Sequence, residues 1–142
     1  MPATTSTWRL TGGDPSALSG LYGWLDAAVE GQNLPADQRH AMHVVLEEAA
    51  MNVVMHACPP GESGDLSIRF LAAPGAATLI LDHGGAAFDP TAAVPPPPPA
   101  GPAEMAPGGL GLVLMRRFCP DIAYERRDGR NRLTLRFPGP TG

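Results

Sequence analysis

Lysine is absent from this sequence, and all ten of its basic residues are arginine. A chain without lysine cannot form a lysine Schiff base with a carbonyl substrate, and it cannot supply the lysine of a P-loop. Both of these enzyme classes are therefore excluded.

Cysteine and long apolar runs are also scarce. The two cysteines, Cys58 and Cys119, form no C-x-x-C pattern, which is typical of structural thiols in a cytoplasmic protein rather than of a metal cluster. No apolar run approaches the roughly 20 residues that span a bilayer. The polar segment from Met1 to Leu10 has no apolar core of a secretion signal. We therefore expect a cytoplasmic location and no membrane partner.

Length and charge set further bounds. The 142 residues suit one domain over residues 1–142, and 44% hydrophobic residues are enough to bury a core. The net charge of −4 argues against direct nucleic-acid binding, because phosphates attract a basic surface.

Two amphipathic helices are predicted in the first half of the chain. Asp14 suits the N-cap of the first helix and Pro15 its first turn. Its apolar stripe recurs at helical spacing through Leu18, Leu21, Tyr22, Leu25 and Val29. The second helix is predicted from about Pro35 to Ala57, before a pair of prolines.

Five short strands are predicted around these helices: Thr7 to Thr11, Ser67 to Leu71, Thr78 to Leu81, Ile122 to Arg126 and Arg132 to Phe137. The short spacing inside the last two pairs favours antiparallel hairpins, the final one turning at Asp128-Gly129. Helices and hairpins segregate along the chain. This order predicts an α+β fold, a two-layer α/β sandwich with a mixed, mostly antiparallel sheet and helices on one face.

A proline-rich stretch interrupts the pattern at about residues 89–108. It contains the run Pro95 to Pro99, which excludes helix and inner strand because proline fixes φ and lacks the N–H donor. So long a loop inside a compact domain is typical of a functional or a disordered segment. Helical spacing returns from Leu110 to Phe118.

The second predicted helix carries a carboxylate and an amide one turn apart, Glu48 and Asn52. Positions four apart are neighbours on one helical face, and here they flank the apolar stripe. An oxygen pair at that rim can reach a cavity between helix and sheet, and oxygen ligands suit Mg²⁺. Alone, the pair also fits a surface glutamate beside an ordinary helical asparagine.

The strand that ends at Leu81 is followed by Asp82-His83-Gly84-Gly85. An aspartate at the end of a buried apolar strand is costly unless it is paired, and a ligand amino group is a natural partner. Gly84 permits close approach of the backbone. Alone, Asp82 also fits a turn residue before glycines. We expect His83 to line the mouth of the pocket.

A glycine-rich loop, Gly108-Gly109-Leu110-Gly111, precedes the short helical segment. Such a loop turns backbone N–H groups toward an anion at a helix N-terminus. It matches neither the P-loop pattern nor the dinucleotide pattern. Alone, it is more often only a turn.

Taken in order, Glu-x-x-x-Asn on a helix, Asp-x-Gly after a strand and Gly-x-Gly before a helix resemble the Bergerat-fold (histidine-kinase-like) ATPases. The match is nearest to the bacterial anti-sigma-factor serine/threonine kinase family. The stretches 48–57, 82–90 and 109–112 are similar to its three nucleotide-binding boxes. The resemblance covers roughly Asp14 to Phe137.

The resemblance implies roles for the first two boxes. Glu48 would be the general base, and Asn52 would coordinate the Mg²⁺ that bridges the phosphates of ATP. Asp82 would accept a hydrogen bond from the adenine amino group, and Gly84 would let the base lie against the backbone.

It implies, for the third box, that Gly109, Leu110 and Gly111 shape the phosphate cradle below a lid at about 89–108. The acceptor would be a serine or threonine on an anti-anti-sigma (STAS-type) protein. A sigma factor or analogous client would be the other partner, and the chain would be a homodimer.

One departure from the family concerns the lid, which has no basic residue between Asp89 and Gly111. A lid without a cation does not threaten nucleotide binding, but it bears on phosphoryl transfer. An alternative function is therefore a nucleotide-dependent anti-sigma or partner-binding module without kinase activity.

Overall fold

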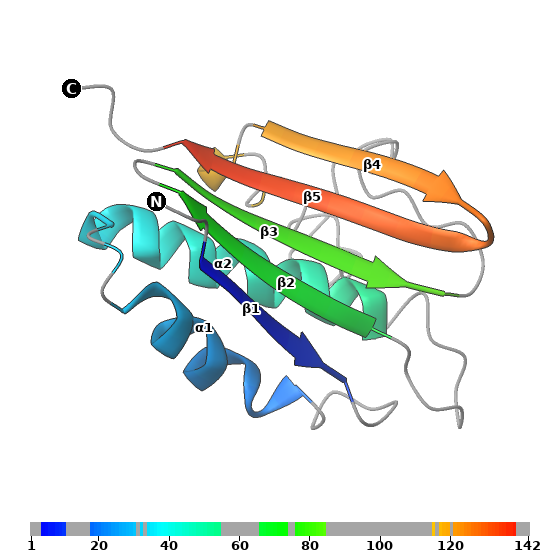
Figure 1. Ribbon diagram of the computed structural model, residues 1–142, viewed down its shortest axis with the longest axis horizontal. Coiled ribbons are helices and arrows are strands. Elements are labelled where there is room, and N and C mark those ends of the chain that lie inside the picture. Colours follow the sequence, from blue (N-terminus) through cyan, green and yellow to red (C-terminus); the bar gives the residue numbers. More distant parts are fainter. Residues whose placement is uncertain are drawn as a thin grey trace, which may run out of the picture.

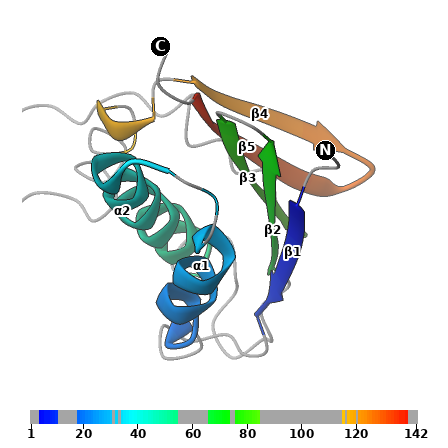
Figure 2. The ribbon, with the colours of Figure 1, turned by 60° about the vertical axis from the view of Figure 1, so that its left-hand side comes forward.

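A computed structural model describes residues 4–10, 18–30, 32, 34–54, 66–73, 76–84, 115, 117–119 and 121–138. In chain order its elements are β1 (Thr4–Arg9), α1 (Leu21–Val29), α2 (Ala36–Asn52), β2 (Leu66–Ala73), β3 (Ala76–His83), β4 (Asp121–Arg127) and β5 (Arg130–Pro138). The two helices cover one face of the sheet (Figures 1 and 2).

The five described strands form one sheet in the order β1-β2-β3-β5-β4. All four pairings between them are antiparallel. The predicted α+β two-layer sandwich with helices on one face is confirmed. We expected a mixed sheet, whereas every described pairing is antiparallel. β2–β3 and β4–β5 are hairpins, β1 and β2 are separated in the chain by both helices, and β3 pairs with β5 across the sequence position of β4.

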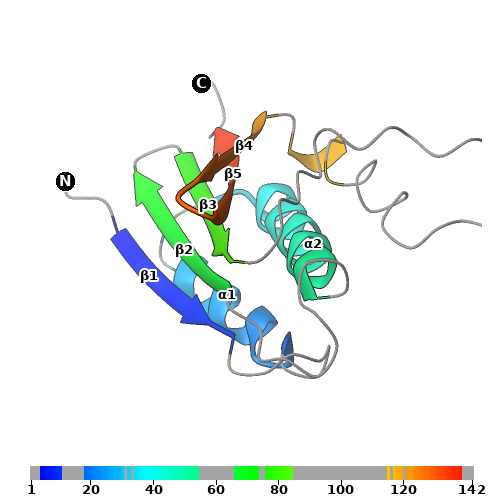
Figure 3. The ribbon, with the colours of Figure 1, turned by 90° about the vertical axis from the view of Figure 1, so that its right-hand side faces the viewer.

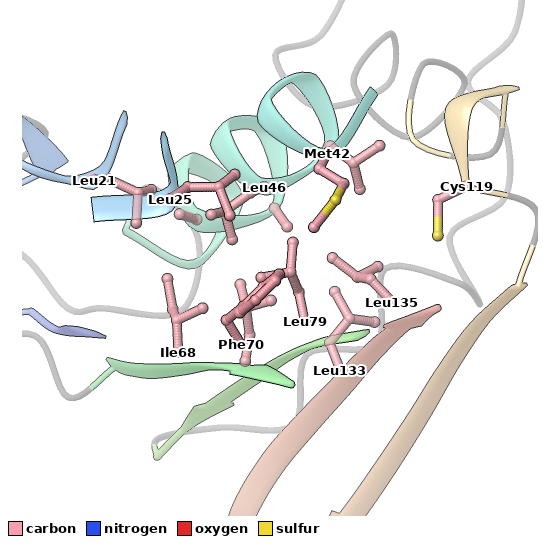
Figure 4. Packing of buried hydrophobic residues seen from close by; sticks show 14 of the residues in the cluster. Leu21, Leu25, Met42, Leu46, Ile68, Phe70, Leu79, Cys119, Leu133 and Leu135 are labelled. Carbon is pink, nitrogen blue, oxygen red and sulfur yellow. The ribbon is translucent and has the colours of Figure 1, made fainter. Parts of the chain in front are cut away.

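Alternating burial along the strands builds the core. In β3, Leu79 and Leu81 are fully buried, while their neighbours on either side are partly exposed. Figure 4 shows Met42 and Leu46 of α2 pointing toward Phe70, Leu79 and Leu135 of the sheet. The sheet face that carries these leucines is called the inner face below, and the opposite face is the outer face.

Two hydrogen bonds fix the helices on the sheet. Trp24 of α1 donates from Nε1 to Oγ of Ser6 in β1, at 2.9 Å. Gln38, at the start of α2, donates from Nε2 to the carbonyl of Phe137 at the end of β5, at 3.0 Å. α2 therefore begins where β5 ends.

The final hairpin turns where the sequence predicted. Asp128 and Gly129 have φ of 55° and 75°, the positive values that a two-residue type I′ turn requires. Residues 74–75, between β2 and β3, lie outside the described residues.

Two predictions about α1 are wrong. The helix begins at Leu21, after a turn at 18–20, and so later than the Asp14-Pro15 signal predicted; residues 11–17 themselves are not described. Tyr22, placed by its spacing on the apolar stripe, is 57% exposed, and its ring stacks on His43 of α2.

Candidate functional site

The C-terminal end of α2 carries the predicted oxygen pair. Glu48 is half-buried, whereas its neighbour Glu47 is exposed, and Asn52 is only 8% exposed. Asn52 is the last residue of α2, and the chain widens into a π turn at residues 53–54. Such turns are rare in proteins, and those that occur are often found at functional sites.

The last residues of β3 point to opposite faces of the sheet. His83 is 3% exposed and follows Leu79 and Leu81 on the inner face. Asp82 lies between Leu81 and His83 in sequence, so its side chain lies on the opposite, outer face of the sheet. Gly84 follows directly, and its carbonyl oxygen accepts a hydrogen bond from Nδ1 of His83 at 3.2 Å.

Asp82 is paired with two arginines on the outer face. Nε of Arg130 lies 2.5 Å from Oδ1 of Asp82, and Nη2 of Arg132 lies 3.3 Å from Oδ2. These partners satisfy the carboxylate without a ligand amino group. They also line an outer-face cavity of about 200 Å³ together with Glu125, Arg127 and Asp128.

The inner face becomes polar where β3 ends. Asn131 of β5 is fully buried and pairs directly with His83. Oδ1 of Asn131 accepts hydrogen bonds from the Tyr124 hydroxyl and, at 3.1 Å, from Nη1 of Arg126. Both donors come from β4, on positions whose partners in β5 are inward-facing. The apolar part of the inner face is thus continued, at this end of the sheet, by four polar side chains: His83, Tyr124, Arg126 and Asn131.

The polar end of the inner face and the end of α2 lie at the same end of the molecule. The first turn of α2 lies beside Phe137, near the end of β5, where Gln38 bonds to its carbonyl. From there α2 runs for 17 residues, about 25 Å at 1.5 Å per residue. It therefore ends toward the beginning of β5, where Asn131 and His83 pair. Figures 1 and 3 show the ends of α2 and β3 together at that end.

The remaining predicted site residues, Gly109, Leu110 and Gly111, lie outside the described residues, as does the lid at 89–108. Of the short helix predicted from Leu110 to Phe118, the structure describes Met115, Arg117 and Phe118. The N–H of Cys119, the next residue, donates to the carbonyl of Met115 at 2.7 Å. No group of three or more metal-ligating His, Cys, Asp or Glu side chains occurs in the part of the chain that the structure describes. A cation here would need phosphate or water oxygens as well.

Two titratable groups elsewhere have shifted pKa values. Burial lowers the pKa of His43 on α2 below its usual range, against the opposing pull of the Asp26 carboxylate, which lies 3.7 Å from Nε2. Burial raises the pKa of the Cys119 thiol to about 11. Neither group lies among the predicted site residues.

Sequence reasoning singled out His83 but not the face of the sheet on which it lies, and it did not single out Asn131. Counting by twos from Leu79 and Leu81 puts His83 on the buried face, and counting back from Leu135 and Leu133 does the same for Asn131. The alternation was therefore readable in the sequence, whereas the pairing of β3 with β5 was not. No helix within the described ranges is long and apolar enough to cross a membrane.

Comparison with known proteins gives a family match over most of the chain. The family described as histidine kinase-like ATPase domain matches residues 13–137. The serine/threonine-protein kinase BtrW of Bordetella bronchiseptica is 35% identical over 135 residues, which cover 95% of this chain and 94% of that protein.

Solved structures agree in fold. The RsbU and RsbW domains of a Mycobacterium tuberculosis protein give a TM-score of 0.64 at 12% identity, covering 98% of this chain and 33% of that one. The histidine kinase domain of an Erythrobacter litoralis blue-light activated kinase gives 0.55 at 13% identity, over 92% and 64%. This chain thus spans a third to two thirds of these structures, which show the fold alone.

Proposed function

Because this chain belongs to the histidine kinase-like ATPase domain family, and within it to the anti-sigma-factor type of serine/threonine protein kinase, we propose that it binds Mg-ATP and phosphorylates an anti-anti-sigma protein. The family predicted from the three boxes is confirmed, and with it the kinase class and the use of ATP. Magnesium, the acceptor and the residue roles are the proposal.

The observation that carries this proposal is the position of Glu48 and Asn52, one turn apart at the end of α2. A carboxylate and a carboxamide stand one turn apart, partly or largely buried, beside the polar end of the inner face. Both offer hard oxygen donors, and such donors fit Mg²⁺, which keeps waters and takes phosphate oxygens for its other positions.

Asn52 would hold the cation through its amide oxygen, and Glu48 would take the proton of the attacking hydroxyl. Bound Mg²⁺ would neutralise charge on the phosphates during transfer. Gly84 would let the base approach the backbone, while Gly109, Leu110 and Gly111 would cradle the phosphates, a role that rests on their sequence pattern. Phosphoryl transfer is mostly positioning and charge stabilisation, so these few groups suffice.

Calorimetric titration of ATP and ADP, with Mg²⁺ and with EDTA, tests the nucleotide site. We expect binding that depends on Mg²⁺ in the wild type and loses that dependence in Asn52→Ala. Incubation with γ-labelled ATP and purified STAS-type proteins of the same organism then tests transfer to serine or threonine. Nucleotide-dependent partner binding without label would favour a partner-binding module, and no nucleotide binding at all would refute the proposal.

A second client and a second copy complete the proposed assembly. A sigma factor or analogous client would compete with the anti-anti-sigma protein for the kinase. Among the strands that the structure describes, β1 lies at an edge of the sheet, and this edge would join a second copy into a homodimer. Light scattering of the purified chain tests the dimer, since a monomer mass at micromolar concentration would exclude it.

A further inference from the structure

Two arginines on the outer face of the sheet have no counter-charge. Arg9 of β1 and Arg69 of β2 alternate along their strands with inward-facing residues, so their side chains lie on the outer face. Arg9 is exposed and Arg69 is half-buried. Among the residues that the structure describes, neither has an ion-pair or hydrogen-bond partner. Figure 2 shows both described helices on the opposite side of the sheet, so neither helix covers these two side chains.

The arginines at the other side of the outer face are neutralised. Four of them, on β4 and β5, have carboxylate oxygens at 2.5–3.4 Å: Arg127, Arg130, Arg132 and Arg136. The unneutralised positive charge on the described part of this face is therefore confined to β1 and β2. Positive charge gathered at one place on a chain of net charge −4 points to a negatively charged partner.

Two hydroxyl groups lie between the unpaired arginines. Ser67 pairs directly with Arg9, and Thr7 pairs directly with Arg69, so guanidinium groups and hydroxyls occupy the corners of a square in alternation. Opposite Cα atoms in such a pair are about 5 Å apart, and alternate residues along a strand are about 7 Å apart. Guanidinium groups only donate hydrogen bonds, and hydroxyls can donate as well. These four residues, called the β1–β2 patch below, suit a carboxylate, which only accepts.

Apolar side chains border the β1–β2 patch. Leu71 follows Arg69 on the same face of β2, and Ile80 of β3 pairs directly with Arg69. Both are half-buried. Another protein buries such side chains when it binds, because protein interfaces combine apolar and polar contacts, whereas nucleic acid contacts a protein mainly through phosphate and sugar. The mixture of charge and apolar surface therefore favours an acidic protein segment over a phosphate polymer.

We propose that the β1–β2 patch docks an acidic segment of a partner protein. Carboxylates of the segment would bind Arg9 and Arg69, and its apolar side chains would cover Leu71 and Ile80. The patch lies on the opposite sheet face from the layer between the sheet and α2, where the nucleotide site is proposed. The two surfaces can therefore be occupied together, and this docking does not require that the chain bind ATP.

A pair of synthetic peptides tests the docking. One is a short, fluorescein-labelled peptide of glutamate and valine, and the other has glutamine in place of every glutamate. Fluorescence anisotropy with the full chain at low salt measures each Kd. Two partly exposed charge contacts predict that the glutamate peptide binds about tenfold more tightly than the glutamine peptide. Arg9→Gln and Arg69→Gln should each weaken its binding about threefold, and the double variant about tenfold.

Matched variants separate the β1–β2 patch from net charge. Arg136→Gln removes the same charge from the same face, at a position already paired with Asp121 at 3.4 Å. Arg39→Gln removes it from α2, where Arg39 lies 3.6 Å from Asp26. We expect both to bind the glutamate peptide within about twofold of the wild type. Melting curves show which variants are folded, and amide NMR shifts of the wild type, which need no variant, should change in β1 and β2 rather than in α2.

The other outcomes overturn the proposal in distinct ways. No binding, equal affinity for the two peptides, shift changes centred on α2, or equal losses in Arg69→Gln and Arg136→Gln would leave no specific patch. Tighter binding of single-stranded DNA or phosphatidylserine vesicles, with the same dependence on Arg9 and Arg69, would make phosphate the ligand in place of a protein carboxylate. A rise in the mass of the chain alone at low salt, abolished by Arg9→Gln, would assign the patch to a second copy.

Discussion

Asp82 and Arg130 lie 48 positions apart in sequence, and Nε of Arg130 donates to Oδ1 of Asp82 at 2.5 Å across the outer face of β3 and β5. The carboxylate is 19% exposed and the guanidinium 42%. An ion pair of this partial exposure is worth little in high dielectric unless other charges join it. Arg132 joins it here, so the three groups form a small network.

The Asp82–Arg130 network predicts a modest coupling in stability. We expect a double-mutant cycle of Asp82→Ala and Arg130→Ala, followed by urea unfolding, to give about 0.5–1 kcal/mol at low salt. Salt near 1 M shortens the Debye length to about 3 Å, so the coupling should shrink. The matched control is Asp121 with Arg136, 3.4 Å apart with both side chains more than half exposed, whose coupling should be smaller. Equal coupling in the two pairs would contradict the network.

Local patterns were enough to predict the fold. Period-two apolar residues marked β2 to β5, and Asp128-Gly129 marked a turn that needs two positive φ values. The start of α1 was wrong because a capping pattern at Asp14-Pro15 says where a helix is able to begin, not where packing holds it. Tyr22 was placed in the core because spacing does not define the width of a buried stripe.

The site was harder to predict than the fold because it depends on pairing between distant strands. The spacing of Glu48 and Asn52 predicted one helical face, and both lie on α2 as expected, although α2 ends at Asn52 and not near Ala57. The partners of Asp82 come from β5, and only the register of β3 with β5 reveals them. The roles of Gly109, Leu110 and Gly111 stay a prediction.

His43 predicts a loss of stability in mild acid. Burial lowers its pKa in the folded chain, whereas the unfolded chain has the ordinary value of about 6.5. The unfolded state therefore binds more protons as the pH falls through this range, and the free energy of unfolding decreases. Stability that is fully present above about pH 6.5 is lost as the pH falls toward the lowered pKa.

Urea unfolding of His43→Leu at pH 7.5 and pH 5.5 checks this. We expect a smaller drop between the two pH values than in the wild type, whatever the change in stability at pH 7.5. His40→Leu removes an exposed histidine one turn earlier on α2 and should keep the wild-type drop. An identical drop in both variants would show that another group causes the acid sensitivity.

Cys119 predicts a thiol that reacts slowly in the folded chain. Its side chain is buried, and the single S–H has two carbonyl acceptors in reach, that of Arg136 at 3.3 Å and that of Asp121 at 3.5 Å from Sγ. A pKa raised from 9.0 to about 11 leaves roughly a hundredfold less thiolate at pH 8, and the thiolate is the reacting form. In a Cys58→Ser background, iodoacetamide should label Cys119 at least that much more slowly in buffer than in denaturing urea. Labelling at the unfolded rate in buffer would mean that the site opens readily.

Glu48 and Glu47 offer a matched pair for the chemical step, because they are adjacent on α2 and differ in burial. Glu48→Gln keeps the shape and polarity of the side chain but removes its basicity. We expect Mg-ADP affinity within a few-fold of the wild type and single-turnover transfer of labelled phosphate reduced by about 10²–10⁴-fold, the range of general-base catalysis. Glu47→Gln changes an exposed residue, so both quantities should stay near wild type. Transfer that is lost in proportion to affinity would place Glu48 in nucleotide binding and would require another base. Wild-type transfer in Glu48→Gln would show that Glu48 is not the general base.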